Sequence, residues 1–207
     1  FTTDEAILPT RGGDWYDGGL WQGLFKHDWG TKNDLVKGSW DYLYRVVALS
    51  NTSLDKLKEI LENDPQNKVV PGYISEVRAF RAMYYYYLLD MFARVPLVTS
   101  STMAMEDVKQ SERSAVFNFV WTELQESVAD LSDAHSNLTG EYYGRMTKPV
   151  AYFLLAKLAL NAEVYMDDNW IDATKLDGKN IKLIVDGAEM NAWQATIAYC
   201  DKIKALE

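Results

Sequence analysis

A repeating spacing of apolar side chains constrains the fold of this chain more than any other feature of its sequence. Over residues 40–61 the apolar positions, Leu43, Val47 and Leu54 among them, recur at intervals of three and four. This spacing places side chains on one face of an amphipathic helix, and Ser39 is a residue type that caps helix N-termini. The same spacing recurs in the segments 73–91, 112–131, 148–166 and 189–203. The sequence therefore predicts a mainly helical, all-α protein.

Two of these helices have apolar patterns that predict how they pack. The segment after Pro71-Gly72 is apolar on nearly every side, so we expect it to be buried on several sides. One face of it carries Tyr73, Val77, Phe80, Tyr84, Leu88 and Met91, and the apolar stripe of the last helix carries Trp193, Ile197, Cys200 and Ile203. Between the last two helices, residues 167–187 are polar around a short apolar run, 181–185, which could be a strand or one arm of a hairpin.

The helices come in pairs that resemble one another. Ala79-Phe80 aligns with Ala151-Tyr152, and Leu43 aligns with Val120 in the preceding helices. Paired helices with a small residue beside an aromatic one are typical of tetratricopeptide-type stacking, although a generic helical bundle would show much of the same pattern. We therefore expect tetratricopeptide-like helical hairpin repeats over residues 39–207. Together with a loop segment, 1–38, they would form a single domain, 1–207.

The loop segment 1–38 differs in kind from the helices. It is rich in both glycine and aromatic residues and has no sustained helical or strand period. The glycines are Gly12, Gly13, Gly18, Gly19, Gly23 and Gly30, and the aromatic residues among them include Trp15, Tyr16, Trp21, Phe25 and Trp29. Such a segment is too aromatic to be a solvated linker, so its rings pack either against the helices or against a ligand.

Composition excludes several classes of protein. The formal net charge is −9 at pH 7 and the basic residues do not cluster, so no nucleic-acid partner is expected. A single cysteine, Cys200, excludes an internal disulfide and a cysteine-based metal site. The longest apolar stretches, such as Phe153–Ala162, are shorter than the roughly 20 residues of a membrane span. Because the chain begins at Phe1 and ends at Glu207 inside a predicted helix, we expect it to be a piece of a longer protein.

The sequence shows no pattern typical of catalysis or of a cofactor. No glycine pattern fits a phosphate-binding loop, no Gly-x-Ser-x-Gly motif occurs, and His27 and His135 are isolated. The acidic run Asp167–Asp172 lacks the glycine and the terminal glutamate of a calcium loop, so we interpret it as a solvated turn. Carboxylate pairs such as Asp14 and Asp17 arise by chance in so acidic a chain. We expect no enzyme activity, no metal and no cofactor, with calcium the only ion worth testing.

The glycine-rich loop has the composition of a sugar-binding site. Flat aromatic rings stack on the apolar faces of sugars, while short polar side chains satisfy the hydroxyl groups. The candidate ligand-binding residues are Arg11, Trp15, Tyr16, Trp21, His27, Trp29 and Asn33. The alternative is structural, since tryptophans in loops often seal a helical core, and Arg11 with Asp14 could equally be an ion pair that fixes the loop.

Several motifs together resemble the SusD/RagB family of bacterial outer-membrane nutrient-binding lipoproteins. The most specific are Glu76-Val-Arg-Ala-Phe-Arg-Ala82 and Arg94-Val-Pro-Leu-Val98. Others are Pro9-Thr-Arg-Gly12 leading into Asp14-Trp-Tyr-Asp-Gly-Gly19, and Gly144-Arg-Met-Thr-Lys148. The matches run from near residue 3 to about residue 165, which would be the N-terminal part of a family that is typically more than twice this long.

The resemblance implies a fold, a function and a location. The fold would be a tetratricopeptide scaffold carrying irregular loops. The function would be non-enzymatic binding of glycans, or in some members peptides, at the cell surface and their delivery to a SusC-like TonB-dependent transporter. The protein would be held at the outer membrane by a lipidated cysteine upstream of Phe1, and further ligand contacts would come from the C-terminal half of the family. Arg78, Arg81 and Tyr84–Tyr87 are interpreted as scaffold, and a helical adaptor that binds a peptide or protein partner is the alternative function.

Overall fold

The computed structural model describes residues 2–3, 5–169, 171–172 and 174–206. The chain is mainly helical, as predicted. The helices are α1 (Leu20–Phe25), α2 (Asp34–Asn63), α3 (Val70–Phe92), α4 (Arg113–Val128), α5 (Lys148–Leu160), α6 (Ala162–Tyr165) and α7 (Ala192–Lys204). Short 3₁₀ turns lie at Asp17–Gly19 and Met105–Asp107, and the strands β1 (Lys182–Val185) and β2 (Ala188–Asn191) complete the list.

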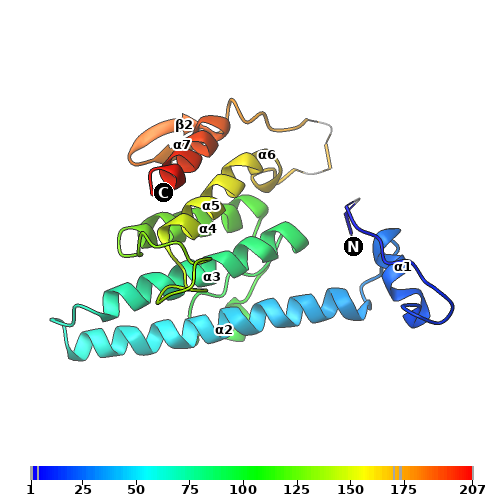
Figure 1. Ribbon diagram of the computed structural model, residues 1–207, viewed down its shortest axis with the longest axis horizontal. Coiled ribbons are helices and arrows are strands. Elements are labelled where there is room, and N and C mark those ends of the chain that lie inside the picture. Colours follow the sequence, from blue (N-terminus) through cyan, green and yellow to red (C-terminus); the bar gives the residue numbers. More distant parts are fainter. Residues whose placement is uncertain (1, 4, 170, 173, 207) are drawn as a thin grey trace. The chain divides into compact units, whose positions relative to one another are not determined.

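The chain divides into two compact units, Phe1–Tyr42 and Leu43–Glu207. In the second unit α3 packs on α4, α4 on α5 and α5 on α7, a stack that can be followed in Figure 1. Consecutive antiparallel helices layered in this way bury one face of each helix pair on the next. The tetratricopeptide-type helical fold predicted from the sequence is thus confirmed. That the whole chain forms a single domain stays a prediction.

The N-terminus of α2 differs from the prediction. The helix begins at Asp34, and the Oδ1 atom of Asn33 accepts hydrogen bonds from the backbone N–H groups of Leu35, at 3.0 Å, and Val36, at 3.1 Å. This is the pattern of an N-cap, which satisfies backbone donors that the first helical turn leaves free. Ser39 lies inside the helix instead, where its hydroxyl donates to the carbonyl of Leu35. The predicted boundary at Ser39 was therefore wrong.

The core of the second unit lies between α2, α3, α4 and α5. Its largest side chains with almost no exposure are Leu54, Tyr85, Leu88, Leu89, Phe117, Leu124, Leu155 and Leu158. Burying a side chain of this size stabilises the fold by about 1.5–3 kcal/mol relative to leaving it in water. Most of the apolar stripe predicted for residues 112–131 belongs to this core, including Val120 and Trp121.

Helix α3 is buried on several sides, as predicted, but only part of its expected face lies inside, with Leu88 fully buried. In α3, Tyr73, Phe80 and Met91 are exposed, while Ala79 and Ala82 are fully buried. Because α3 is apolar on nearly every side, the spacing could not decide which side faces inward. The small alanine side chains allow the neighbouring helix to approach closely, and this places them inside.

In α7 the predicted stripe also faces outward. Trp193, Ile197 and Cys200 are exposed, whereas Ala195 and Tyr199 are buried against the rest of the unit. The helix begins at Ala192 rather than near residue 189 because a capping box fixes its start. The side chain of Asn191 accepts a hydrogen bond from the backbone N–H of Gln194. The side chain of Gln194 in turn accepts one from the backbone N–H of Asn191.

The segment before α7 contains the hairpin that the apolar run at residues 181–185 indicated. β1 and β2 pair antiparallel, with Val185 opposite Ala188. The two residues of the turn, Asp186 and Gly187, have φ values of 51° and 80°, and positive φ at both positions is the mark of a type I′ hairpin turn. The helix predicted over residues 148–166 is broken at Asn161, whose side chain donates to the carbonyl of Lys157 at 2.9 Å.

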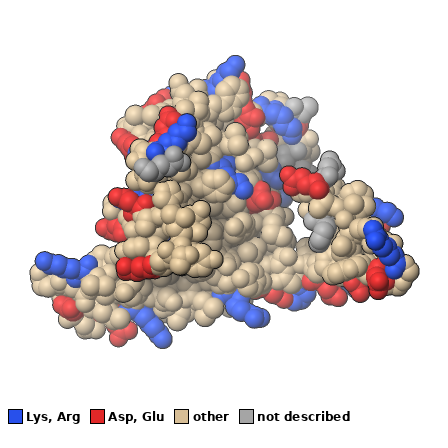
Figure 2. Space-filling view, viewed as in Figure 1, with Lys and Arg blue, Asp and Glu red and all other residues tan. Residues whose placement is uncertain are grey.

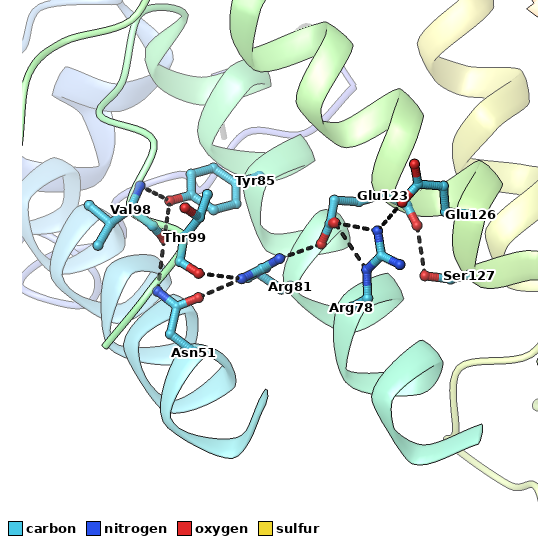
Figure 3. A network of polar contacts seen from close by, with 9 residues as sticks. All are labelled: Asn51, Arg78, Arg81, Tyr85, Val98, Thr99, Glu123, Glu126 and Ser127. Atoms are coloured by element: carbon cyan, nitrogen blue, oxygen red, sulfur yellow. Dashed lines mark hydrogen bonds and ion pairs between the residues drawn. The ribbon is translucent and has the colours of Figure 1, made fainter. Parts of the chain in front are cut away.

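A buried polar network joins three elements of the second unit, as Figure 3 shows. Arg81 of α3 donates to the Oδ1 atom of Asn51 at 2.8 Å, to the carbonyl of Thr99 at 3.0 Å and to Glu123 of α4. Arg78 donates twice to the other oxygen of Glu123, at 2.7 and 3.0 Å. Both arginines therefore belong to the scaffold, as predicted. Of the tyrosine run, Tyr85 and Tyr86 are buried and Tyr87 is 40% exposed.

The acidic run after α6 is less solvated than expected. Asp167 is buried, and the carboxylate of Asp168 accepts a hydrogen bond from the backbone N–H of Ser114 at 2.9 Å in the first turn of α4. An anionic group at this position is favoured by the helix dipole. Within the described part of the chain, no three His, Cys, Asp or Glu side chains come together as metal ligands would.

The described helices include none with the length and apolar character needed to cross a bilayer. On the face that Figure 2 shows, acidic and basic side chains are scattered among each other. A protein that binds a phosphate backbone needs its positive charges gathered on one surface. The expectation that nucleic acid is not a partner stays a prediction.

Candidate functional site

The Phe1–Tyr42 unit exposes aromatic rings. Trp15 is 55% exposed, Tyr16 53% and Trp29 40%, although tryptophan and tyrosine are usually buried over most of their surface. The rings form edge-on pairs: Trp15 lies 5.9 Å from Trp21 at an interplanar angle of 73°, and His27 lies 5.3 Å from Trp29 at 65°. An edge-on partner supports a ring and leaves a face of it open.

Hydrogen bonds anchor one ring of each pair within the unit. The carboxylate of Asp17 accepts from the indole N–H of Trp21 at 2.6 Å. The Nε2 atom of His27 lies 2.8 Å from the carbonyl of Thr2, and because a carbonyl only accepts, this nitrogen carries the proton. Each pair of rings thus has one member anchored to a neighbouring polar group.

The backbone of this segment is strained at three positions. Trp15, Asp17 and His27 have φ values of 57°, 39° and 56°. Side chains other than glycine rarely adopt positive φ, at a cost of order 1–3 kcal/mol each, and such residues cluster at functional sites. In the described chain only Ala93 and Asp186 share this property. The strain therefore concentrates where the rings are exposed.

Arg11 and Asp14 are joined through their backbones. The N–H of Arg11 donates to the carbonyl of Asp14 at 3.3 Å, and the N–H of Asp14 donates back at 3.1 Å. These two residues form an isolated β-bridge that closes the turn before Trp15. Both side chains are exposed, and the structure records no ion pair between them. The alternative of a loop-fixing ion pair is thus replaced by a backbone bridge.

The structure places the predicted site residues in three groups. Trp15 and Trp21 form one ring pair, and His27 and Trp29 form the other. Arg11 and Tyr16 are exposed near the first pair in the sequence. Asn33 is different, because its side-chain oxygen caps α2 and only its amide nitrogen is left for a ligand. Whether any of these residues contacts a ligand stays a prediction.

The family of the chain follows from a comparison with known sequences. The model of a SusD-like family, described as "Starch-binding associating with outer membrane", matches residues 12–160. The match covers well over half of the chain, so the chain belongs to the SusD-like family. The resemblance seen in the sequence motifs is confirmed.

Individual relatives are similar over parts of the chain. A SusD-like protein of Formosa agariphila is 27% identical over 134 residues, which are 65% of this chain and 24% of that protein. The starch-binding protein SusD of Bacteroides thetaiotaomicron is 30% identical over 91 residues, 44% of this chain and 15% of that protein. The chain thus spans about a quarter or less of the length of these curated relatives.

Solved structures share the fold. A laminarin-binding SusD-like protein superposes with a TM-score of 0.67 at 23% identity, covering 91% of this chain and 34% of that one. A SusD homologue from Bacteroides thetaiotaomicron also has a TM-score of 0.67, at 20% identity, covering 89% of this chain and 32% of that one. At this level of identity the likeness concerns the fold alone.

Proposed function

We propose that this protein binds glycans without transforming them, through the exposed rings of its N-terminal unit. The observation that carries the proposal is the exposure of Trp15, whose backbone has a positive φ, and of Trp29, with each ring supported from its edge by a partner. Rings that are held in place before the ligand binds lose little conformational entropy on binding. A rigid site therefore binds its ligand more tightly than a flexible one. The family description and the laminarin-binding structural relative support a carbohydrate ligand.

The proposal includes the place of this binding in the cell. The family description names association with the outer membrane. We therefore infer a cell-surface protein, lipid-anchored at the outer membrane, that hands its glycan to a SusC-like TonB-dependent transporter. A binder that delivers glycan to a transporter must release it intact, so incubation with polysaccharide should yield no new reducing ends. Release of reducing sugar above a blank would contradict the non-enzymatic part of the proposal.

The test compares two tryptophans of similar exposure. Trp29 is 40% exposed in the N-terminal unit, and Trp193 is 43% exposed on α7. The affinity of the wild-type protein for starch, laminarin and xyloglucan oligosaccharides is measured by calorimetry and then repeated with Trp29→Ala and Trp193→Ala. We expect Trp29→Ala to lower the affinity about tenfold, since losing one stacked ring costs roughly 1.4 kcal/mol.

The Trp193→Ala protein controls for the general loss of an exposed aromatic side chain. Its affinity should stay at the wild-type value. Equal affinities of all three proteins, or equal losses in both variants, would remove the N-terminal rings from the glycan site. The expected result is a loss confined to Trp29→Ala at an unchanged melting temperature.

A second candidate function is supported by the exposed side chains of α3 and α5. Phe80 and Tyr87 of α3 and Phe153 and Leu160 of α5 are 37–60% exposed, and a helical-repeat protein can bind a peptide or a partner protein on such a surface. A ligand that binds only the folded state raises the melting temperature. A rise with free peptide and none with free oligosaccharide would favour this adaptor function over glycan binding.

A further inference from the structure

A pocket lies in the Leu43–Glu207 unit, where α4, α5, α7 and the β1–β2 hairpin meet. The hairpin and α7 can be found at the end of the helix stack in Figure 1. The pocket has a volume of about 290 Å³, and the residues that matter for its chemistry are Gln125, Glu126, Tyr152, Ile184, Asp186 and Tyr199. At roughly 30 Å³ for each water molecule, this is room for about ten waters, or for one sugar ring with its hydroxyl groups.

A buried tyrosine hydroxyl offers an unused donor to this pocket. Tyr199 is 2% exposed, and its oxygen accepts a hydrogen bond from the Nε2 atom of Gln125 at 2.8 Å. Burial raises the pKa of Tyr199 to about 12, so the hydroxyl keeps its proton near neutral pH. Among the described residues that proton has no recorded acceptor, and a buried hydroxyl favours one.

Gln125 offers an unused acceptor beside it. Its Nε2 atom donates to the carbonyl of Ile184 at 2.6 Å and to the hydroxyl of Tyr199, so both amide hydrogens are used. The Oε1 atom has no recorded donor in the part of the chain that the structure describes. Because the two bonds through Nε2 hold the amide group in place, the orientation of this acceptor is fixed before any ligand binds.

The carboxylates at the pocket are already paired with cations. Asp186 uses one oxygen for Lys202, at 2.5 Å, and Glu126 uses one for Arg78. Each carboxylate keeps a second oxygen that can accept a hydrogen bond. Because Lys202 and Arg78 compensate the charges of the two carboxylates, the pocket offers hydrogen-bond acceptors and does not require a cationic ligand.

The remaining wall of the pocket is apolar. The rings of Tyr152 and Tyr199 lie 5.9 Å apart at an interplanar angle of 33°, and Leu155 and Val128 line the same pocket. Ile184 of the hairpin is 49% exposed at its edge. An apolar wall, fixed acceptors and one buried donor are the combination that a sugar ring requires, because its C–H faces are apolar and its hydroxyl groups both donate and accept.

We propose that this pocket binds one neutral pyranose ring, as a second carbohydrate site on the helical scaffold. The site is built from residues 125–199 and does not depend on the exposed rings of the N-terminal unit. The ring is either a free monosaccharide or the terminal unit of a longer glycan, and both present the same pyranose ring to the pocket.

The test follows binding residue by residue with methyl-labelled isoleucines. The probes are methyl α-glucoside, methyl β-galactoside and maltotriose. Ile184 reports on the pocket, and Ile197, which is also exposed but does not line it, is the matched control. We expect saturable shifts at Ile184 and none at Ile197. A response to either methyl glycoside indicates that a free ring suffices, whereas a response to maltotriose alone indicates a terminal unit of a chain.

Two tyrosine variants decide whether the pocket itself binds the probe. Tyr199→Phe removes the unused donor, together with the oxygen that accepts from Gln125, and we expect about tenfold weaker binding. Tyr165→Phe removes a buried hydroxyl elsewhere on the scaffold, where it donates to Asp90, and should bind as the wild type does. If Tyr199→Phe does not fold, Asp186→Gly at the exposed rim replaces it. It removes both carboxylate oxygens at a positive φ that glycine accepts, and the same weakening is expected.

Other results would overturn the proposal. They are the absence of saturable shifts at Ile184, equal shifts at Ile197, or wild-type affinity in Tyr199→Phe or its replacement. The same titration in a Trp29→Ala background separates the two sites. If Ile184 still responds there, the pocket stands even where the N-terminal rings prove not to bind glycan. If the response at Ile184 disappears with Trp29, the pocket is not an independent site.

Discussion

Replacing Arg81 by methionine tests whether the buried network of Figure 3 holds the scaffold together. Methionine fills a similar volume but makes none of the hydrogen bonds that Arg81 donates to Asn51, Thr99 and Glu123. Removing one partner of a buried ion pair costs about 3–5 kcal/mol, because the other charge is left uncompensated. The structure determines where in this range the loss should fall.

Two features place the loss near the lower end. Arg78 still donates to Glu123 at 2.7 and 3.0 Å, so the carboxylate keeps a counter-charge. In addition, the Nε atom of Arg81 is buried and has no hydrogen-bond partner among the described residues, and methionine removes this unsatisfied group. Against these, Asn51 and the carbonyl of Thr99 each lose a donor. We therefore expect Arg81→Met to lower the free energy of unfolding by about 3 kcal/mol.

Urea unfolding followed by circular dichroism measures this loss, with Arg78→Met as the matched control. The side chain of Arg78 is 24% exposed against 6% for Arg81, so its removal should cost only about 1 kcal/mol. A Glu123→Leu variant completes a double-mutant cycle, in which Arg81→Met and Glu123→Leu together should cost less than the sum of their separate effects. Equal losses in the two arginine variants, or strict additivity in the cycle, would refute this reasoning.

Three further predictions follow from single contacts. Leu124 is fully buried, so Leu124→Ala should lower the free energy of unfolding by about 2–5 kcal/mol in the same urea assay. A Cβ on Gly178 would lie 2.5 Å from the Nε1 atom of Trp193, so Gly178→Ala should displace the indole ring and change the near-ultraviolet circular dichroism; an unchanged spectrum would count against the contact. The hydroxyl of Ser101 holds the pKa of Asp55 below its usual range, and an NMR titration of Ser101→Ala should show that pKa moving back up. Since the pKa of Asp55 is lower in the folded protein, its contribution to stability is present above the unfolded pKa and is lost as the pH falls through the folded one.

The sequence predicted the helices well and their ends less well. Apolar spacing identifies a helix because the pattern is repeated along the whole element, so one atypical residue does not change the prediction. The ends depend on local competition instead. Asn33 and Ser39 are both good capping residues, and only the structure shows that the side chain of Asn33 reaches the free N–H groups. The break at Asn161 is likewise a local hydrogen-bonding choice within an apolar pattern that continues past it.

The candidate site was predictable in its residue types but not in its geometry. The aromatic and glycine content marked the N-terminal segment as a candidate binding segment, and the structure shows that Trp15 of this segment is exposed. The positive φ values of Trp15 and His27 have no signature in the sequence, because such strain is imposed by surrounding contacts. The pocket around Tyr199 was missed for a different reason. Its residues are spread from position 125 to 199 and meet only through the stacking of helices.

Asp17 links strain to binding in the N-terminal unit. Its φ of 39° is unfavourable for aspartate, while its carboxylate fixes the indole of Trp21, which in turn supports Trp15 from the edge. Asp17→Gly relieves the strain, since glycine accepts positive φ at little cost, and it also releases the ring pair. We expect a free energy of unfolding within about 1 kcal/mol of the wild type, together with weaker glycan binding.

The matched variant Asp17→Asn separates these two effects. Asparagine tolerates positive φ better than most residues and keeps a side-chain oxygen that can accept the indole N–H of Trp21. It should therefore preserve both stability and affinity, measured by urea unfolding and by calorimetry with the oligosaccharides. Wild-type affinity in Asp17→Gly would mean that the orientation of the rings does not matter for binding.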